Sequence, residues 1–293
     1  DHRDASGETI ETGAGAAVNA NTGSVAFDRT VYPVPFGTLT ESGIGFKLHS
    51  TVGIVDSTDD LDAGAVVVHI RVTDADYDTS AQGQDSIADG AAWTGTFSSS
   101  ADHRTVIKVE RGSNEQVIST PGNSTSPLVE VSPDSGVFEF DQSISYDDGP
   151  SNGCPTIFTT ASLNGCVLQG DIVTVTYKDL TDASGKSQTV TDSATFDLRN
   201  GVLQSDKSVY LIGSDMILTL IEPDFDLDND GAESLTLDLV EWDSDAVETT
   251  LGGKQLPASD DALAFDPEPS AFRETGDSTG IFQVVIEIPA ELG

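Results

Sequence analysis

Basic side chains are scarce in this chain of 293 residues. Only 13 lysines and arginines stand against 50 aspartates and glutamates, which leaves a formal net charge of −37. Because phosphate contacts need basic residues, this deficit argues against nucleic acid as a partner, and it also disfavours docking on anionic lipid. The excess of carboxylates instead favours cations, high ionic strength, or both.

Cysteine is equally scarce, since Cys154 and Cys166 are the two cysteines of the chain. An isolated close pair in a sequence rich in Gly, Ser, Thr and Asp is typical of a disulfide that closes one loop of a secreted protein. Such a loop closure stabilises the folded state by roughly 3 kcal/mol. No other soft ligand lies nearby for a zinc site. The sequon that begins at Asn123 fits an exposed, glycosylated loop.

Long apolar runs and catalytic motifs are also absent from the sequence. No run of membrane-spanning length and no signal peptide is present, so we expect either a removed signal or an internal piece of a longer chain. The four histidines show no metal-ligand spacing, and no Gly-x-Ser-x-Gly motif supplies a nucleophile. We interpret His69, which points outward from a predicted strand, as a plain surface residue. The sequence therefore predicts that the protein is not an enzyme.

Short segments of alternating apolar and polar residues are abundant, and they predict an all-β fold. Three of them each place every second residue on one apolar face: Val66, Val68, Ile70 and Val72; Val173, Val175 and Tyr177; and Phe282, Val284, Ile286 and Ile288. Segments of this kind build antiparallel sheets with one buried face and one face in water. The dense Gly and Asp between them suits the loops of β-sandwiches.

The chain also repeats itself, at a shift that falls from 178 to 144 residues. Three phrases return in the same order: "FDRTVYP" (27–33) as "SDKSVYL" (205–211), "VTDADYD" (72–78) as "IEPDFD" (221–226), and "EVSPDSGVF" (130–138) as "ETGDSTGIF" (274–282). The shrinking shift places an insertion in the first copy, within residues 37–65.

These matches predict a first repeat at residues 24–200 and a second repeat at 201–293. Residues 1–23 would be the tail strand of a preceding module or a linker, and a division of the first repeat near residue 150 stays open. Nothing after Phe282 matches the last strands of the first copy, so the second repeat is expected to be truncated and the chain to be a window in a longer array. Such a repeat would expose a sheet edge unless neighbouring sequence or another subunit covers it.

The stretch "DFDLDNDG" at 224–231, the acidic loop, places an aspartate on every second position and ends in glycine. This spacing matches the front of a calcium loop, in which alternate residues turn oxygens to one side and glycine allows a sharp turn. An EF-hand needs glutamate at its twelfth position, which is Leu237 here, so we expect a different cage. The predicted Ca²⁺ ligands are Asp224, Asp226, Asp228, Asp230 and Glu233, with Asp238 as an alternative to Glu233. A hydrated turn that binds counterions diffusely is the competing interpretation.

The matching segment of the first copy supplies a second candidate set of metal ligands: Asp74, Asp76 and Asp78. A third acidic stretch, "DSTDDLD" at 56–62, is interpreted as a solvated loop. Carboxylates about 6 Å apart repel by roughly 0.7 kcal/mol in bulk water, so such loops depend on divalent ions or salt even without a shaped cage. Ammonium would experience the same potential without needing a shaped site.

Three phrases together resemble the large surface-layer (S-layer) proteins of ammonia-oxidising archaea: "HIRVTDADYD", "ETGDSTGIF" and "SDKSVYLIGSDMILTLIEPDFDLDNDGAES". The resemblance covers most of the chain from about Ser24 onward. It implies tandem immunoglobulin-like domains, secretion, and self-assembly into a hexagonal two-dimensional lattice on the cell surface. It also implies an acidic lattice that enriches cations, including ammonium, near the membrane. That family generally lacks catalytic residues, so the resemblance assigns none to this chain.

Three functions therefore compete. The first is a structural S-layer component whose acidic surface binds and enriches cations such as Ca²⁺ and ammonium. The second is a secreted, calcium-stiffened adhesin of tandem immunoglobulin-like domains. The third is a carbohydrate-binding or carbohydrate-processing module, for which Trp93 and Trp242 would stack on sugars, although lone tryptophans in β modules are usually core or interface residues. The first is the function that we expect.

Overall fold

The computed structural model describes residues 20–36, 64–91, 102–145, 167–243, 248–251 and 265–290, together with the short strands β1 (His2–Arg3) and β2 (Thr9–Ile10). Regular structure in these ranges consists of strands and two single-turn 3₁₀ helices, η1 (Pro223–Phe225) and η2 (Leu237–Leu239). The predicted all-β class is confirmed for this part of the chain.

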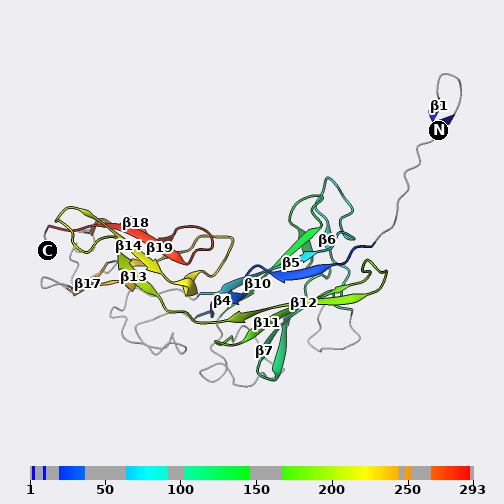
Figure 1. The fold of residues 1–293 in the computed structure, drawn as a ribbon, viewed down its shortest axis with the longest axis horizontal. Helices are drawn as coiled ribbons and strands as arrows, with labels where there is room; N and C mark the ends of the chain where they lie inside the picture. The colour runs from blue at the N-terminus through cyan, green and yellow to red at the C-terminus, as the bar shows by residue number, and fades with distance from the viewer. Residues whose placement is uncertain are drawn as a thin grey trace.

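Two five-stranded sheets form the first repeat (Figure 1). One sheet has the order β3 (Ser24–Phe27), β5 (Val66–Thr73), β10 (Val137–Ile144), β9 (Leu128–Glu130) and β6 (Ser86–Ile87). The other has the order β4 (Val31–Tyr32), β12 (Gln188–Phe196), β11 (Ile172–Asp179), β7 (Thr105–Arg111) and β8 (Asn114–Ser119). Neighbouring strands are antiparallel except for β4, which runs parallel to β12.

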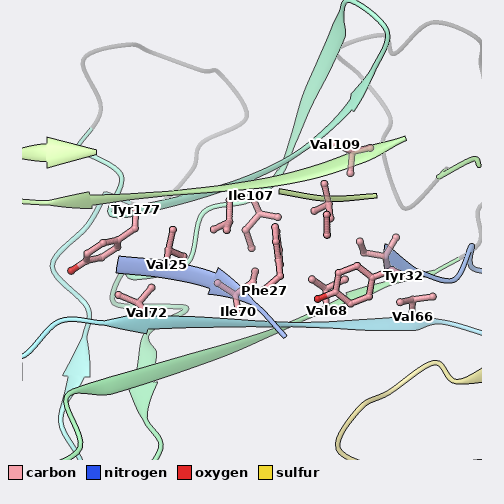
Figure 2. Close-up of a cluster of buried hydrophobic side chains, with 14 of the residues drawn as sticks. Val25, Phe27, Tyr32, Val66, Val68, Ile70, Val72, Ile107, Val109 and Tyr177 are labelled. Atoms are coloured by element: carbon pink, nitrogen blue, oxygen red, sulfur yellow. The ribbon is translucent and has the colours of Figure 1, made fainter. Parts of the chain in front are cut away.

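The two sheets enclose one apolar core, in which side chains of β3 and β5 face side chains of β7 and β11 (Figure 2). The alternation predicted in the first repeat is confirmed by the buried residues Val66, Val68, Ile70, Val72, Val173, Val175 and Tyr177. Each such side chain contributes about 1.5–3 kcal/mol by leaving water. The core joins Phe138 and Ile144, before residue 150, to Phe196, after it, so the described residues on both sides of this position share one core.

The second repeat contains a sheet with the same order as the first sheet of the first repeat (Figure 1). Its strands are β13 (Val202–Ser205), β14 (Asp215–Ile221), β19 (Ile281–Glu287), β18 (Glu268–Glu274) and β15 (Ser234–Leu235). A separate hairpin pairs β16 (Glu241–Asp243) with β17 (Glu248–Thr250). Phe282, Val284 and Ile286 are buried as the alternation predicted, whereas Ile288 is half-buried beyond the end of β19.

The acidic loop and its neighbours form the joint between the two repeats. Leu227 packs against the cores of both repeats, and its carbonyl accepts a 2.9 Å hydrogen bond from the Val67 amide at the edge of the first repeat. Phe36 of the first repeat meets Phe225 of the second with ring centroids 5.5 Å apart. The loop that the sequence presents as a cation site therefore also has a structural role.

Candidate cation-binding site

Each repeat carries a cluster of three carboxylates whose oxygens lie within 4.8 Å of one another. The first cluster is formed by Asp78, Asp85 and Glu130, and the second cluster by Asp226, Glu233 and Glu274. The members correspond one to one at the repeat shifts of 148 and 144 residues. The two copies of the sequence repeat thus place three carboxylates at equivalent positions of the structure.

A glutamate at the end of a strand anchors each cluster and closes a tight turn. One Glu130 oxygen accepts hydrogen bonds from the amides of Ser135, at 2.9 Å, and Gly136, at 2.8 Å. One Glu274 oxygen accepts from Thr279 and Gly280 in the same way, at 2.7 Å each.

Glycine is needed at the end of this turn in both repeats. The φ angles of Gly136 and Gly280 are +60° and +58°. A Cβ at Gly280 would also lie 2.7 Å from the Cα of Pro223, so both the conformation and the space exclude a side chain.

The second carboxylate of each cluster lies on the loop that leads into the short edge strand. Asp85 accepts from the amides of Thr79 and Ser80 at 2.7 and 2.8 Å. Its counterpart Glu233 accepts from Leu227 and Asp228 at 2.9 and 2.8 Å. These bonds use one oxygen of Glu233, while its Oε2 is buried and no donor among the described residues reaches it.

The electrostatics of the second cluster oppose full ionisation. Burial, followed by the proximity of Glu274, raises the pKa of Glu233 to about 8. Burial also raises the pKa of Asp226, although Arg29 opposes this shift. For Glu274, the effect of burial is outweighed by hydrogen bonding with Glu233 and with the backbone of Thr279, so its pKa is lowered. The second cluster therefore retains a proton near neutral pH unless another positive charge replaces it.

The first cluster differs from the second, because its Asp78 alone has a raised pKa and Asp85, the counterpart of Glu233, has a lowered one. Burial, and then the charges of Glu130, Asp134 and Asp85, raise the pKa of Asp78. Backbone amides of Thr79 and Ser80 lower the pKa of Asp85. Each repeat thus holds at least one carboxyl in an environment that favours neutralisation, which is Asp78 in the first cluster and Asp226 and Glu233 in the second.

Both clusters fit a hard divalent cation in donor type and spacing. Ca²⁺ binds carboxylate oxygens at about 2.3–2.6 Å, so two of its ligands lie no more than about 5 Å apart. The oxygens of each cluster meet this limit, and all three donors are carboxylates. The buried Oε2 of Glu233 is the oxygen that most lacks a partner. Ca²⁺ would thus be held by three carboxylates in each repeat.

Three of the eight predicted metal ligands take part in these clusters. Asp226 and Glu233 converge with Glu274, and Asp78 converges with Asp85 and Glu130. The other five point to different partners, which the following paragraphs describe. Asp238, the alternative to Glu233, has no described side chain.

Alternate aspartates of the acidic loop do not converge on one point, contrary to the calcium-loop interpretation. Asp224 accepts from the backbone and side chain of Arg199 at 2.8 and 3.2 Å. Asp226 bonds to Arg29 of the first repeat at 2.8 Å. Asp228 bonds to His69 at 2.8 Å, and Asp230 lies 3.8 Å from the same ring. Their charges are used to dock the loop on the first repeat.

Asp74 and Asp76 are likewise held by hydrogen bonds outside the first cluster. Asp74 is buried and accepts from the hydroxyl of Tyr177 at 2.6 Å, and burial raises its pKa. Asp76 accepts from the backbone and side-chain amides of Asn21 at 2.9 and 3.0 Å. Neither belongs to a group of metal-ligating side chains among the residues that the structure describes.

His69 is buried, with 3% of its surface exposed, so its interpretation as a surface residue is wrong. The alternation correctly placed it on the outer face of β5, but the acidic loop covers that face. Its two ring nitrogens lie 2.8 Å from Asp141 and from Asp228. Glu139 and Asp230 lie within 4.0 Å of the ring as well. His69 with Glu139 and Asp230 has metal-ligand spacing, but both ring nitrogens already have carboxylate partners.

His69 is expected to titrate above its ordinary value. Burial of the ring lowers its pKa, but hydrogen bonds to Asp228 and Asp141 outweigh this and raise the pKa above 6.5. A raised histidine pKa stabilises the folded state below pH 6.5, and this stabilisation is lost as the pH rises through the folded pKa. An NMR titration of the imidazole protons should show one resonance titrating above 6.5 that is missing in His69→Gln. A pKa below 6.5 for that resonance would contradict the conclusion that Asp141 and Asp228 stabilise the charged form of His69 at the joint.

Asn123 is buried although Ser124 and Thr125 of its sequon are exposed, so the exposure predicted for the acceptor side chain is wrong. Its surface is 4% exposed, and its side-chain nitrogen donates to the carbonyl of Thr120 at 2.6 Å. Its side-chain oxygen accepts from the amide and hydroxyl of Thr125 at 2.9 and 2.7 Å. A glycan on this nitrogen would have to displace the bond to Thr120.

Several other predicted features fall partly or wholly outside the described residues. The predicted disulfide of Cys154 and Cys166, the acidic stretch 56–62 and Trp93 lie there. Trp242 is described, and its ring lies 5.0 Å from that of Phe265 in the core of the second repeat. This packing favours a core role over sugar stacking.

Comparison of the chain with protein-family models finds no match, and comparison with curated proteins finds no significant match. Within the described residues there is no helix with the length and apolar character needed to cross a membrane.

Proposed function

We propose that the chain is a structural component of a cell-surface layer, built from immunoglobulin-like β-sandwiches that self-assemble into a two-dimensional lattice and hold cations. Ca²⁺ occupies the two carboxylate clusters, and the remaining acidic surface enriches cations such as ammonium. The protein acts outside the cell and has no catalytic role.

The observation that carries this proposal is the recurrence of the three-carboxylate cluster in both repeats. Both repeats keep three acidic groups together at an electrostatic cost, and at least one member of each cluster has a raised pKa. A bound cation removes this cost, and rigid cation sites suit a module that must keep its shape in an assembly.

The charge distribution supports cation enrichment at the surface. Eight of the basic side chains already lie within 4.0 Å of a carboxylate: Arg29, Arg71, Arg104, Lys108, Arg111, Lys178, Arg199 and Lys207. The formal net charge of −37 therefore rests on carboxylates that have no basic partner, and the surface carries a strong negative potential. This potential attracts monovalent ions without a shaped site.

The immunoglobulin-like assignment is supported by the two packed sheets of the first repeat and by the division of its first strand between them. β3 pairs in one sheet, and β4, which begins four residues after the end of β3, pairs in the other. The S-layer assignment is supported by the sequence phrases that resemble the archaeal family. Together they favour a structural surface protein over a carbohydrate module.

Reassembly in the presence of calcium tests this function. Protein freed of metal with EDTA and returned to Ca²⁺ is expected to form ordered arrays visible by negative-stain electron microscopy. Na⁺ at equal ionic strength should not replace Ca²⁺, and a double variant Asp85→Asn, Glu233→Gln, which changes one member of each cluster, should lose the calcium effect. A chain that stays dispersed while its melting temperature rises with Ca²⁺ would support the adhesin. No arrays and no thermal shift would overturn the proposal.

A further inference from the structure

His69 lies at the joint between the repeats, on the outer face of β5, and is 3% exposed. It stands directly opposite Asp141 on the neighbouring strand β10. Glu139, two residues earlier on β10, shares this outer face because alternate residues of a strand point the same way. The acidic loop of the second repeat covers the face and adds Asp228 and Asp230. Two strands of the first repeat and one loop of the second thus surround a single imidazole.

This group of side chains does not belong to the repeated architecture. At the repeat shifts of 148 and 144 residues, the second repeat has neither histidine nor carboxylate at the matching positions, which are Ile217, Gln283 and Val285. β14 nevertheless pairs with β19 in the same register as β5 pairs with β10. The sheet therefore does not need these polar groups, and they meet only where the acidic loop crosses β5.

The imidazole of His69 requires a positive charge at this point. Each ring nitrogen faces a carboxylate oxygen at 2.8 Å, Nε2 that of Asp228 and Nδ1 that of Asp141. A neutral imidazole carries one N–H, so it can donate to only one of the two carboxylates. The other nitrogen then directs its lone pair at a negatively charged oxygen. A second proton on the ring relieves this repulsion, and so does a metal ion between nitrogen and oxygen.

Nδ1 is the nitrogen that faces the larger negative charge. Besides Asp141, oxygens of Asp230 and Glu139 lie 3.8 and 4.0 Å from it. Nε2 faces Asp228, whose oxygen is also fixed by the Asp230 amide at 3.0 Å. A histidine that ligates a metal almost always donates its other N–H to a carboxylate, a carbonyl or water, which sets the tautomer. Asp228 is placed to accept this hydrogen, which leaves Nδ1 for an ion.

The charges around the ring favour a divalent ion over a proton. Four carboxylates meet here: Glu139, Asp141, Asp228 and Asp230. Arg71 supplies one positive charge, 3.1 Å from Glu139. A protonated imidazole adds a second positive charge and still leaves two of the four negative charges uncompensated. A divalent ion beside the neutral imidazole leaves only one.

The donor set fits Zn²⁺ better than Ca²⁺. Zn²⁺ takes imidazole nitrogen and carboxylate oxygen at about 2.0–2.2 Å, so two of its donors lie at most about 4.2 Å apart. The distances from Nδ1 to Asp141, Asp230 and Glu139 all meet this limit. Ca²⁺ takes oxygen ligands, which the two carboxylate clusters offer without an imidazole. The side chains of Asp141 and Asp230 are 60% and 59% exposed, so an ion can reach the buried ring from solvent.

We propose that a Zn²⁺ ion binds at this point of the joint and links the two repeats. Its ligands are Nδ1 of His69 and the carboxylates of Glu139, Asp141 and Asp230, and Asp228 orients the imidazole. Three ligands come from the first repeat and one from the acidic loop of the second, so the ion holds the loop on β5. The site differs in chemistry from the two carboxylate clusters and does not depend on Ca²⁺ in them.

Titration of the metal-free full chain with Zn²⁺ in excess Ca²⁺ tests the site, because Ca²⁺ fills any site made of carboxylates alone. Isothermal titration calorimetry near neutral pH is expected to show one saturable Zn²⁺ site in the wild type that His69→Gln lacks. Asp230→Asn should weaken binding at this site at least tenfold. Asp215→Asn removes the same charge at an exposed position of β14, so it should leave Zn²⁺ binding unchanged.

Co²⁺ in place of Zn²⁺ provides a spectroscopic readout of the same site. The wild type should show visible Co²⁺ absorption that His69→Gln loses and that Zn²⁺ displaces. Asp230→Asn decides the outcome if His69→Gln does not fold, because the Asp230 side chain is mostly exposed. Binding of Zn²⁺ by a chain that does not respond to Ca²⁺ would support this site and contradict the calcium assignment alone.

Two results would overturn the zinc site and leave the proposed function untouched. One is the absence of saturable Zn²⁺ binding in excess Ca²⁺, which would show that any Zn²⁺ bound without Ca²⁺ occupies the carboxylate clusters. The other is equal Zn²⁺ affinity in the wild type, His69→Gln and Asp230→Asn, which would place the ion elsewhere on the chain.

Discussion

Replacing Arg29 with methionine is expected to loosen the joint between the repeats and to lower the free energy of unfolding by about 3 kcal/mol. The guanidinium donates to the carbonyl of Asp226 at 2.7 Å and to its carboxylate at 2.8 Å. Both side chains are almost entirely buried. Removing one partner leaves the Asp226 carboxylate without its counterion beside Glu233 and Glu274, which adds repulsion within the second cluster.

Urea unfolding followed by fluorescence and by circular dichroism measures this effect. In a Trp93→Phe background, Trp242 reports on the second repeat, and its transition should separate from the circular dichroism transition once the joint is lost. Small-angle X-ray scattering should show a larger maximum dimension for Arg29→Met.

Arg71→Met is the matched control for Arg29→Met. Arg71 is half-exposed and pairs with Glu139 on the neighbouring strand of the same sheet, so its loss should change stability by less than about 0.5 kcal/mol. In an Asp226→Asn background, Arg29→Met should cost only about 1 kcal/mol, because no buried charge is left unpaired. If Arg29→Met and Arg71→Met lose equal amounts of stability, Arg29 does not stabilise the joint between the repeats.

Strands such as β5, β11 and β19 could be predicted because their signal is local. Every second residue is apolar, and the buried faces observed in these strands follow that period. The same period placed His69 correctly on the outer face of β5. It could not show that this face is covered, because the covering residue Asp228 lies 159 positions away in the sequence.

The acidic loop shows a second limit of sequence reasoning. Alternate spacing places Asp226, Asp228 and Asp230 on one side only if the loop curves around an ion, and here the loop lies along another surface. A local motif contains no information about that surface. The basic residues that meet the loop, Arg29 and Arg199, come from distant strand ends.

Sequence reasoning missed Asp85, Glu130 and Glu274, although a signal for them was present. Glu130 and Glu274 open the two matching phrases, each with a hydroxyl residue and a glycine at the fifth and sixth positions that follow. Asp85 and Glu233 are both acidic at the shift of 148 residues. Comparing the acidic residues of the two copies position by position would have identified both clusters, because the repeat conserves geometry that simple spacing does not.

Without a bound cation, the second repeat is expected to lose stability as the pH rises from about 4.5 to about 8. Burial and the proximity of Glu274 raise the pKa of Glu233 to about 8, above its unfolded value of 4.5. A raised carboxyl pKa means that the folded state holds a proton that the unfolded state releases, so deprotonation across this window disfavours folding. The loss should be roughly 2 kcal/mol after allowance for solvent screening of the half-exposed carboxyl.

Glu233→Gln should remove this pH dependence, because the amide supplies hydrogens in place of the retained proton and carries no charge. In EDTA at pH 8 the variant should be more stable than the wild type. Urea unfolding of both proteins at pH 5, 6.5 and 8 measures the two slopes of stability against pH. Asp215→Asn is the control, because it changes the net charge equally at an exposed position of β14. If the wild type gains stability relative to Glu233→Gln between pH 5 and pH 8, the second cluster does not retain a proton on Glu233.

Calcium should reverse the order of stability of the wild type and Glu233→Gln. A cation bound among Asp226, Glu233 and Glu274 replaces the proton, so the wild type should gain about 2.7 kcal/mol at a Ca²⁺ concentration one hundred times the dissociation constant. Glu233→Gln lacks one ligand and should gain much less, while Asp215→Asn should respond as the wild type does. If the pH slope is present but Ca²⁺ changes neither protein, the cluster is a proton-sharing pair and the calcium assignment fails. The two measurements together therefore separate the electrostatics of the site from the identity of the ion that it holds.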